Sequence, residues 1–79
     1  MRKVMVDLLR AYAIAVMDHE ARADEAFARA EAMEAEFPNI AAALRRHSRH
    51  YRVAAMELNA KSVALCELHE RIFRASAYD

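Results

Sequence analysis

A single proline, Pro38, most constrains the fold of this chain, because it stands in a sequence that has no glycine. Without glycine, few positions suit tight turns, phosphate-binding loops or two-residue β-hairpins. Nucleotide-binding folds built on glycine-rich loops, and most all-β folds, are therefore disfavoured. Proline disfavours helix in the residue before it but is well tolerated in a first helical turn. We therefore predict one reversal of the chain, at Phe37-Pro38-Asn39.

The segments on both sides of Pro38 have the composition of helices. They are rich in alanine, glutamate, arginine, leucine and methionine, which have high helix propensity. Acids also stand four residues before bases, the favourable orientation for ion pairs on a helix surface. These pairs are Asp18–Arg22, Glu25–Arg29, Glu57–Lys61, Glu67–Arg71 and Glu70–Arg74. We predict helices over about residues 3–36 and 39–75, with either Asn39 as the cap of the second helix or Pro38 as its first residue.

Both segments carry mostly apolar residues at alternating spacings of four and three, the pattern of helices that pack as a coiled coil. In the first segment these positions are Met5, Leu9, Tyr12, Val16, His19, Ala23, Ala26, Ala30, Met33 and Phe37. In the second they are Ile40, Leu44, His47, Tyr51, Ala54, Leu58, Lys61, Leu65, Leu68 and Ile72. Folding the chain back at Pro38 often brings a large residue opposite a small one, which lets two helices interdigitate. The sequence therefore predicts an all-α fold, an antiparallel two-helix hairpin, with residues 1–79 as a single domain.

A hairpin of two helices leaves about half of each helix exposed, and domains of this size rarely bury enough apolar surface on their own. Further apolar residues cannot all point into the contact between the two helices. We predict that these residues form an oligomer interface: Val6, Ala13, Met17, Val53, Met56, Ala60, Val63 and Phe73. The simplest arrangement is a homodimer in which two hairpins form a four-helix bundle. The alternative is docking on a larger protein partner.

The most conspicuous local feature is a basic cluster made of Arg45, Arg46, Arg49 and Arg52. Residues 37–56 carry four arginines and no acid, whereas residues 18–36 carry seven acids and two arginines. These segments lie side by side in a hairpin, so one interpretation is charge pairing that fixes orientation and register. The alternative is a patch that contacts nucleic-acid phosphates or an acidic protein partner. The formal net charge of zero disfavours a dedicated polyanion binder.

Patterns typical of catalysis or metal binding are weak. His47 and His50 are one helical turn apart, but a metal site would need further ligands from other helices. A metal or haem role for these two, for His19 or for His69 is the least favoured alternative. Cys66 is the only cysteine, so no internal disulfide forms, and we predict that its side chain is buried. We therefore predict that the protein is not an enzyme and needs no cofactor.

The first residues are a basic pair followed by an apolar stretch, which invites comparison with a signal peptide. Asp7 and Arg10 interrupt this stretch, and it is shorter than the roughly 20 residues that span a bilayer. We predict a cytoplasmic protein that does not contact membranes. The predicted function is that of a non-catalytic interaction or assembly module, and the alternative is a small RNA- or DNA-binding regulator.

Overall fold

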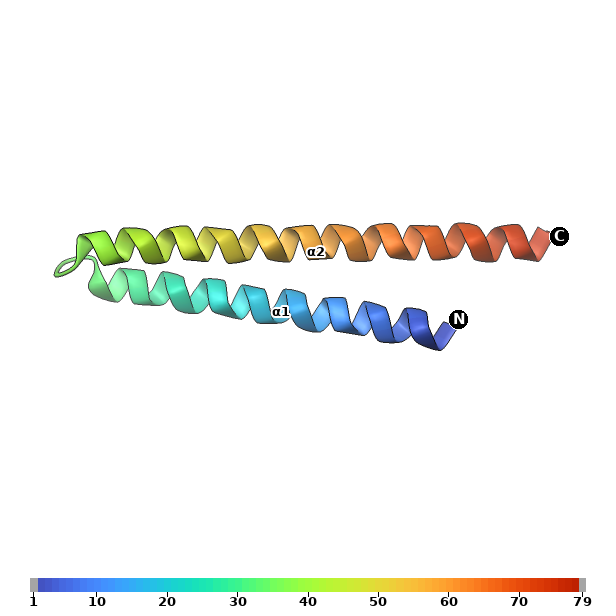
Figure 1. Ribbon diagram of the computed structural model, residues 1–79, viewed down its shortest axis with the longest axis horizontal. Coiled ribbons are helices and arrows are strands. Elements are labelled where there is room, and N and C mark those ends of the chain that lie inside the picture. Colours follow the sequence, from blue (N-terminus) through green and yellow to red (C-terminus); the bar gives the residue numbers. More distant parts are fainter. Residues whose placement is uncertain (1, 79) are drawn as a thin grey trace.

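The computed structural model describes residues 2–78, and the side chains of residues 2–76. It contains two antiparallel helices, α1 (Arg2–Met33) and α2 (Pro38–Tyr78), joined by a short turn (Figure 1). The predicted all-helical hairpin is therefore confirmed. Neither helix of residues 2–78 contains a stretch with the length and apolar character that crossing a membrane requires.

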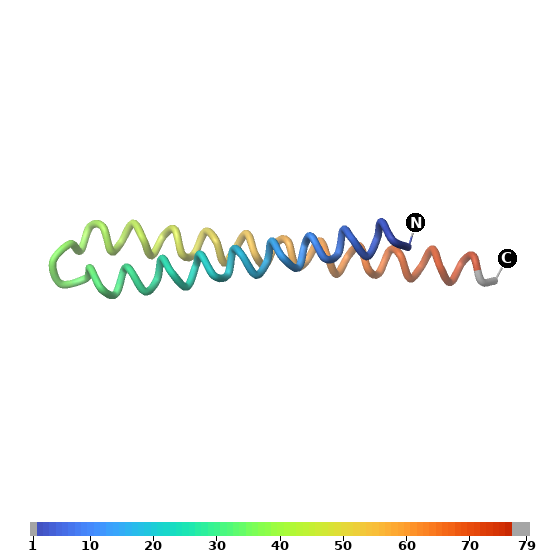
Figure 2. Tube along the Cα trace, turned by 90° about the horizontal axis from the view of Figure 1, so that it is seen from below, coloured from blue at the N-terminus to red at the C-terminus, as the bar shows by residue number. Residues whose placement is uncertain are grey.

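The hairpin is a rod that measures 66 × 16 × 10 Å. Its radius of gyration is 18.4 Å, whereas a compact domain of this length would have about 12 Å. In Figure 1 the two helices draw apart toward the N-terminus, while in the perpendicular view of Figure 2 they converge and cross there. The helices therefore wind around each other, and α2 continues past the N-terminal end of α1 (Figure 1).

The chain reverses earlier than predicted, because α1 already ends at Met33. The Phe37 N–H donates a hydrogen bond of 2.8 Å to the Met33 carbonyl and closes the turn. Residues 34–36 are Glu-Ala-Glu, good helix formers, so composition placed the end of the helix too late. Pro38 occupies the first helical position, where its missing N–H costs nothing. The Phe37 carbonyl accepts the first helical bond, from the Ala41 N–H at 3.0 Å, so the cap residue is Phe37 and not Asn39.

The packed face of α1 is the one that the sequence predicts. Ala23, Ala26 and Ala30 are buried, and the other predicted positions from Met5 to Met33 are half-buried. Only the last predicted position, Phe37, lies outside the helix and is exposed. The methyl side chains in the middle of this face allow the two helices to approach closely.

The packed face of α2 differs from the prediction at every second position. Leu44, Tyr51, Leu58 and Leu65 are half-buried, as predicted, but the last predicted position, Ile72, is exposed. At the intervening positions the packed face is shifted by one residue. The predicted Ile40, His47, Lys61 and Leu68 are exposed. The residue that follows each of them is covered instead: Ala41, Ser48, Ser62 and His69. Ala55 is likewise more buried than the predicted Ala54. At Ala41, Ser48 and Ala55 the reason is steric, because only small side chains fit where α2 passes the buried alanines of α1.

The buried core contains only small side chains, all from the half of the rod near the turn. Its members are Ala23, Ala26, Ala30, Ala41, Ser48 and Ala55, and no larger side chain among the described residues is fully buried. The Ser48 hydroxyl donates a hydrogen bond of 2.8 Å to the Ala23 carbonyl on the other helix. This bond satisfies the one buried polar side chain and fixes the two helices at their closest approach.

Candidate functional site

Two arginines of the basic cluster pair with acids of α1. Arg52 reaches Asp24 at 2.9 Å, and Arg45 reaches Glu34 at 2.7 Å. Both ion pairs are partly exposed, so each contributes about 0.2–1 kcal/mol to stability. Their geometry follows from the opposite charges of residues 18–36 and 37–56, and it agrees with the interpretation that charge fixes the register of the hairpin.

The other two arginines of the cluster have no such partner. Within the described side chains, Arg46 and Arg49 form no ion pair, and both are exposed. They also lie on different sides of α2. Arg49 lines a hollow with Arg45, Arg52 and Phe27, whereas Arg46 lines one with the two histidines that follow it at 47 and 50. Arg46 therefore lies apart from the other three arginines. Arg45, Arg49 and Arg52, whose spacing of four and three predicts one helix face, line the same hollow.

We call the side of the rod that carries Met17 and Met56 the methionine face. Residues seven apart lie on the same side of a coiled-coil helix, which places Met17 with Asp24. Asp24 and Met56 line one hollow between the helices, so both helices contribute to this face. Glu20 and Asn59 line the same hollow. Steps of seven from these two residues and from Met56 add Val6, Ala13 and Phe27 from α1 and Val63, Cys66 and Phe73 from α2. The same steps also place the charged Lys3, Arg10, Glu31 and Glu70 on this face.

All eight residues predicted for the interface are exposed in the hairpin. Six of them share the methionine face: Val6, Ala13, Met17, Met56, Val63 and Phe73. The other two, Val53 and Ala60, follow the spacing of the outer side of α2, beside Met56. Among the five larger side chains of these six, Met17 and Met56 are the most exposed, at 69 % and 70 %. The hairpin itself therefore leaves all of the predicted residues uncovered, and most of them share one side of the rod.

The opposite side of the rod, the histidine face, carries a cluster of rings around Tyr51. The Tyr51 ring lies 5.9 Å from that of His19, 6.2 Å from that of His47 and 6.4 Å from that of His50, measured between ring centroids. His47 stacks on the phenol, whereas His19 approaches it edge-on from α1. Tyr51 therefore connects the two helices through an aromatic contact.

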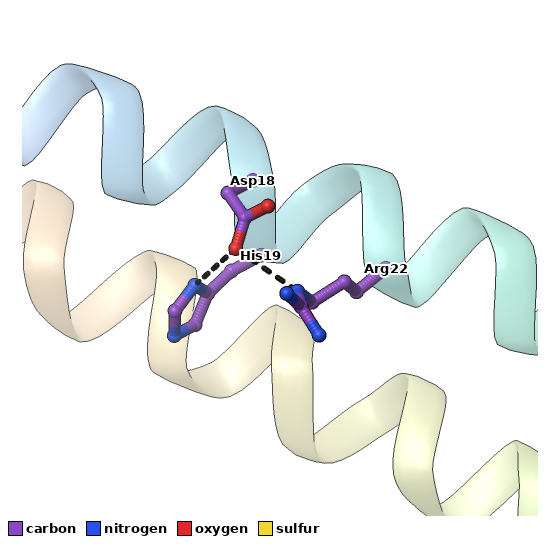
Figure 3. A network of polar contacts seen from close by, with 3 residues as sticks. All are labelled: Asp18, His19 and Arg22. Atoms are coloured by element: carbon purple, nitrogen blue, oxygen red, sulfur yellow. Dashed lines mark hydrogen bonds and ion pairs between the residues drawn. The ribbon is translucent and has the colours of Figure 1, made fainter.

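Asp18 joins this cluster to a cation on α1 (Figure 3). Its carboxylate accepts a hydrogen bond of 3.0 Å from Arg22 Nε and lies 4.0 Å from His19 Nδ1. The hydrogen bond to Asp18 is the main cause that raises the pKa of Arg22 above its ordinary value, and Tyr51 adds to the effect. Arg22 is therefore positively charged at neutral pH.

His19 lowers the stability of the hairpin, because its Nδ1 atom is buried and has no hydrogen-bond partner. A buried polar atom without a partner costs about 1–3 kcal/mol. Phenylalanine preserves the size of the ring and its edge-on contact with Tyr51 but has no polar atom. We expect His19→Phe to raise the free energy of unfolding by about 1 kcal/mol, measured by urea denaturation at fixed protein concentration.

The control for this change is His50→Phe, which alters the same residue type beside the same tyrosine at an exposed position. We expect it to change stability by less than about 0.5 kcal/mol. Equal effects of the two substitutions would show that ring hydrophobicity, and not the orphaned nitrogen, determines the result.

The residues considered for metal or redox chemistry are on the surface. His47 and His50 are both exposed, and no cluster of three or more His, Cys, Asp or Glu side chains suited to a metal ion occurs in the described residues. The prediction that Cys66 is buried is wrong, because its thiol is exposed. Cys66 follows the spacing of the methionine face, between Asn59 and Phe73, and this face is uncovered in the hairpin.

Comparison with known protein families, with curated protein sequences and with solved structures found no match to this chain.

Two residues that the sequence analysis did not single out belong to these surfaces. Ser48 supplies the buried hydrogen bond between the helices. The seven-residue repeat of small residues at 41, 48, 55 and 62 was the signal for it. Phe27 lies on the methionine face and is 45 % exposed. The residues seven positions before and after it are Glu20 and Glu34, so Phe27 is not part of an apolar repeat in the sequence.

Proposed function

We propose that this chain is a non-catalytic protein-interaction module that acts as a helical-hairpin dimer or as a small subunit of a larger complex. In either case the covered surface is the methionine face. The protein presents two long helices, and another protein surface covers the apolar residues that the hairpin leaves exposed.

The observation that carries this proposal is the mismatch between what the hairpin buries and what it exposes. The buried core consists of five alanines and one serine, while fourteen large apolar side chains among the described residues remain exposed. Burying a large apolar side chain stabilises a protein by about 1.5–3 kcal/mol, and burying an alanine by much less. A core of this kind is too small to hold a domain of this size together without a further contribution.

The surface area supports the same conclusion. The chain exposes 6368 Å², whereas a compact monomer of 9.0 kDa exposes about 4,900 Å². The excess is roughly 1,500 Å², and a standard protein interface buries about 800 Å² on each partner. The hairpin thus has enough uncovered surface for a stable interface along its length.

Sedimentation equilibrium of the purified chain tests the proposal. We expect a mass of at least two chains at micromolar concentration. We also expect the temperature of thermal unfolding to rise with protein concentration, because association stabilises the folded state. A helical monomer that unfolds cooperatively at a temperature independent of concentration, and that retains no partner from its native source, contradicts the proposal.

A further inference from the structure

The methionine face has two halves with different chemistry. The half away from the turn is mainly apolar, with Val6, Ala13 and Met17 on α1 and with Val63 and Phe73 on α2. Its charged members, Lys3, Arg10 and Glu70, lie toward the end farthest from the turn. The half near the turn is charged. There α1 contributes acids and α2 contributes arginines, and Phe27 lies among them. The boundary between the halves lies close to Met17 and Met56.

The charged half is divided strictly by helix. On α1 this face carries Glu20, Asp24, Glu31 and Glu34, and on α2 it carries Arg45, Arg49 and Arg52. Two of the arginines already pair with acids of their own chain. Arg49 and Glu31 form no ion pair within the described side chains. The face therefore offers one strip of negative charge and one strip of positive charge, both incompletely neutralised.

A second copy of the chain complements this face in one orientation. A two-fold axis along the rod keeps every residue at its level and places α1 on the α2 of the partner. Apolar halves then meet apolar halves, and the acidic strip of each copy meets the arginine strip of the other. An axis across the rod, with full overlap, instead lays the apolar half of one copy on the charged half of the other.

In a third arrangement the two-fold axis again runs across the rod, but only the two apolar halves overlap. The area that this arrangement buries distinguishes it from full overlap. Helix α1 is about 48 Å long and the rod is 16 Å wide, so full overlap of the two-helix part covers roughly 800 Å² of each copy. Half of that area falls below the roughly 800 Å² per partner that a standard interface buries. Full overlap is therefore the arrangement that a stable dimer favours.

We propose that the methionine face binds a second copy of this chain with both turns at the same end of the dimer, so that α1 packs on the α2 of the partner. This proposal rests on the proposed function and specifies its partner. Asp24 and Arg52 are paired within one chain, so they mark one level of the rod. Near that level Asp24 also meets the partner's Arg49, and about 10 Å farther from the turn Met17 meets the partner's Met56.

Pulsed electron paramagnetic resonance on a spin-labelled variant measures the orientation directly. The label is attached to Glu36→Cys, in the exposed turn, in a chain that also carries Cys66→Ser. Packed helices lie about 8–10 Å apart, so we expect the two labels within roughly 30 Å of each other. Turns at opposite ends would separate the labels by about the 66 Å length of the rod or more.

Charge reversal supplies the independent test. Arg49→Glu removes a contact that exists only between copies, and we expect the dissociation constant of the dimer to rise by roughly tenfold or more. The matched control is Arg46→Glu, which makes the same change in net charge three residues away but on the outer side of α2, where Arg46 lines a hollow with His47 and His50. We expect the control to leave the dissociation constant within about twofold.

The outcomes separate this inference from the proposed function. A dimer with a short label distance and a selective effect of Arg49→Glu supports both. A dimer with labels far apart, or with equal effects of the two arginine substitutions, overturns the orientation while the proposed function stands. A chain that stays monomeric overturns the dimer and, if no other partner binds it, the proposed function as well.

Discussion

Replacing Ala23 by leucine is expected to lower the free energy of unfolding by about 3 kcal/mol. Ala23 is completely buried where the helices approach most closely. Overpacking at such a contact typically costs about 1–3 kcal/mol. The larger side chain also forces the helices apart, which breaks the hydrogen bond from Ser48 to the Ala23 carbonyl. A buried hydroxyl without a partner adds about 1–3 kcal/mol, although the two effects overlap.

Ala28→Leu is the matched control for this change, because Ala28 is an exposed alanine in the same helix. Leucine and alanine have similar helix propensity, so the control should alter stability by less than about 0.5 kcal/mol. Urea denaturation of both variants at equal protein concentration gives the comparison. If Ala23→Leu is as stable as the control, the close contact described for Ala23 and Ser48 does not exist in solution.

Replacing Met56 by glutamate is expected to weaken association by at least about 100-fold, which corresponds to roughly 3 kcal/mol. Met56 is 70 % exposed in the hairpin, and glutamate has similar helix propensity, so the hairpin tolerates the change. In the assembly the same position is covered. A carboxylate there is taken out of water without a partner, which costs several kcal/mol. Sedimentation equilibrium over a range of concentrations measures the effect.

Ala64→Glu introduces the same charge at an exposed position of α2 that does not follow the spacing of the methionine face. Its dissociation constant should stay within about threefold of that of the unmodified chain. Circular dichroism of both variants at the same concentration verifies that the helices form. Strong association of the Met56 variant would place the interface on another side of the rod.

The fold was predictable because one residue interrupts two long helix-forming segments. Pro38 identified the reversal, and the spacing of apolar residues identified the packed face of α1 from Met5 to Met33, failing only at Phe37. The face of α2 was predicted only in part. Apolar character favoured Ile40, and the spacing of four and three favoured His47, whereas the structure places the small residues Ala41 and Ser48 at the contact. Close approach of the helices is a property of the pair, and it is not visible in either helix alone.

The candidate surface was predictable in character but not in its pairings. Segment charges indicated attraction between residues 18–36 and 37–56, and the structure realises it as Arg52–Asp24 and Arg45–Glu34. Which arginine meets which acid depends on the register, and a shift of one residue in α2 changes every partner. The exposed apolar residues were identified because they exceed what one contact between two helices can accommodate.

The position of the turn gives the rod two unlike poles. Both helix ends at Arg2 and Tyr78 lie toward one pole, and residues 34–37 make up the other (Figure 1). A protein fused to either terminus therefore sits at the far pole from the turn and leaves the turn accessible. With both turns at one end, a pair of such rods would hold two fused proteins next to each other and tens of ångströms from whatever contacts the opposite pole, as a molecular spacer does.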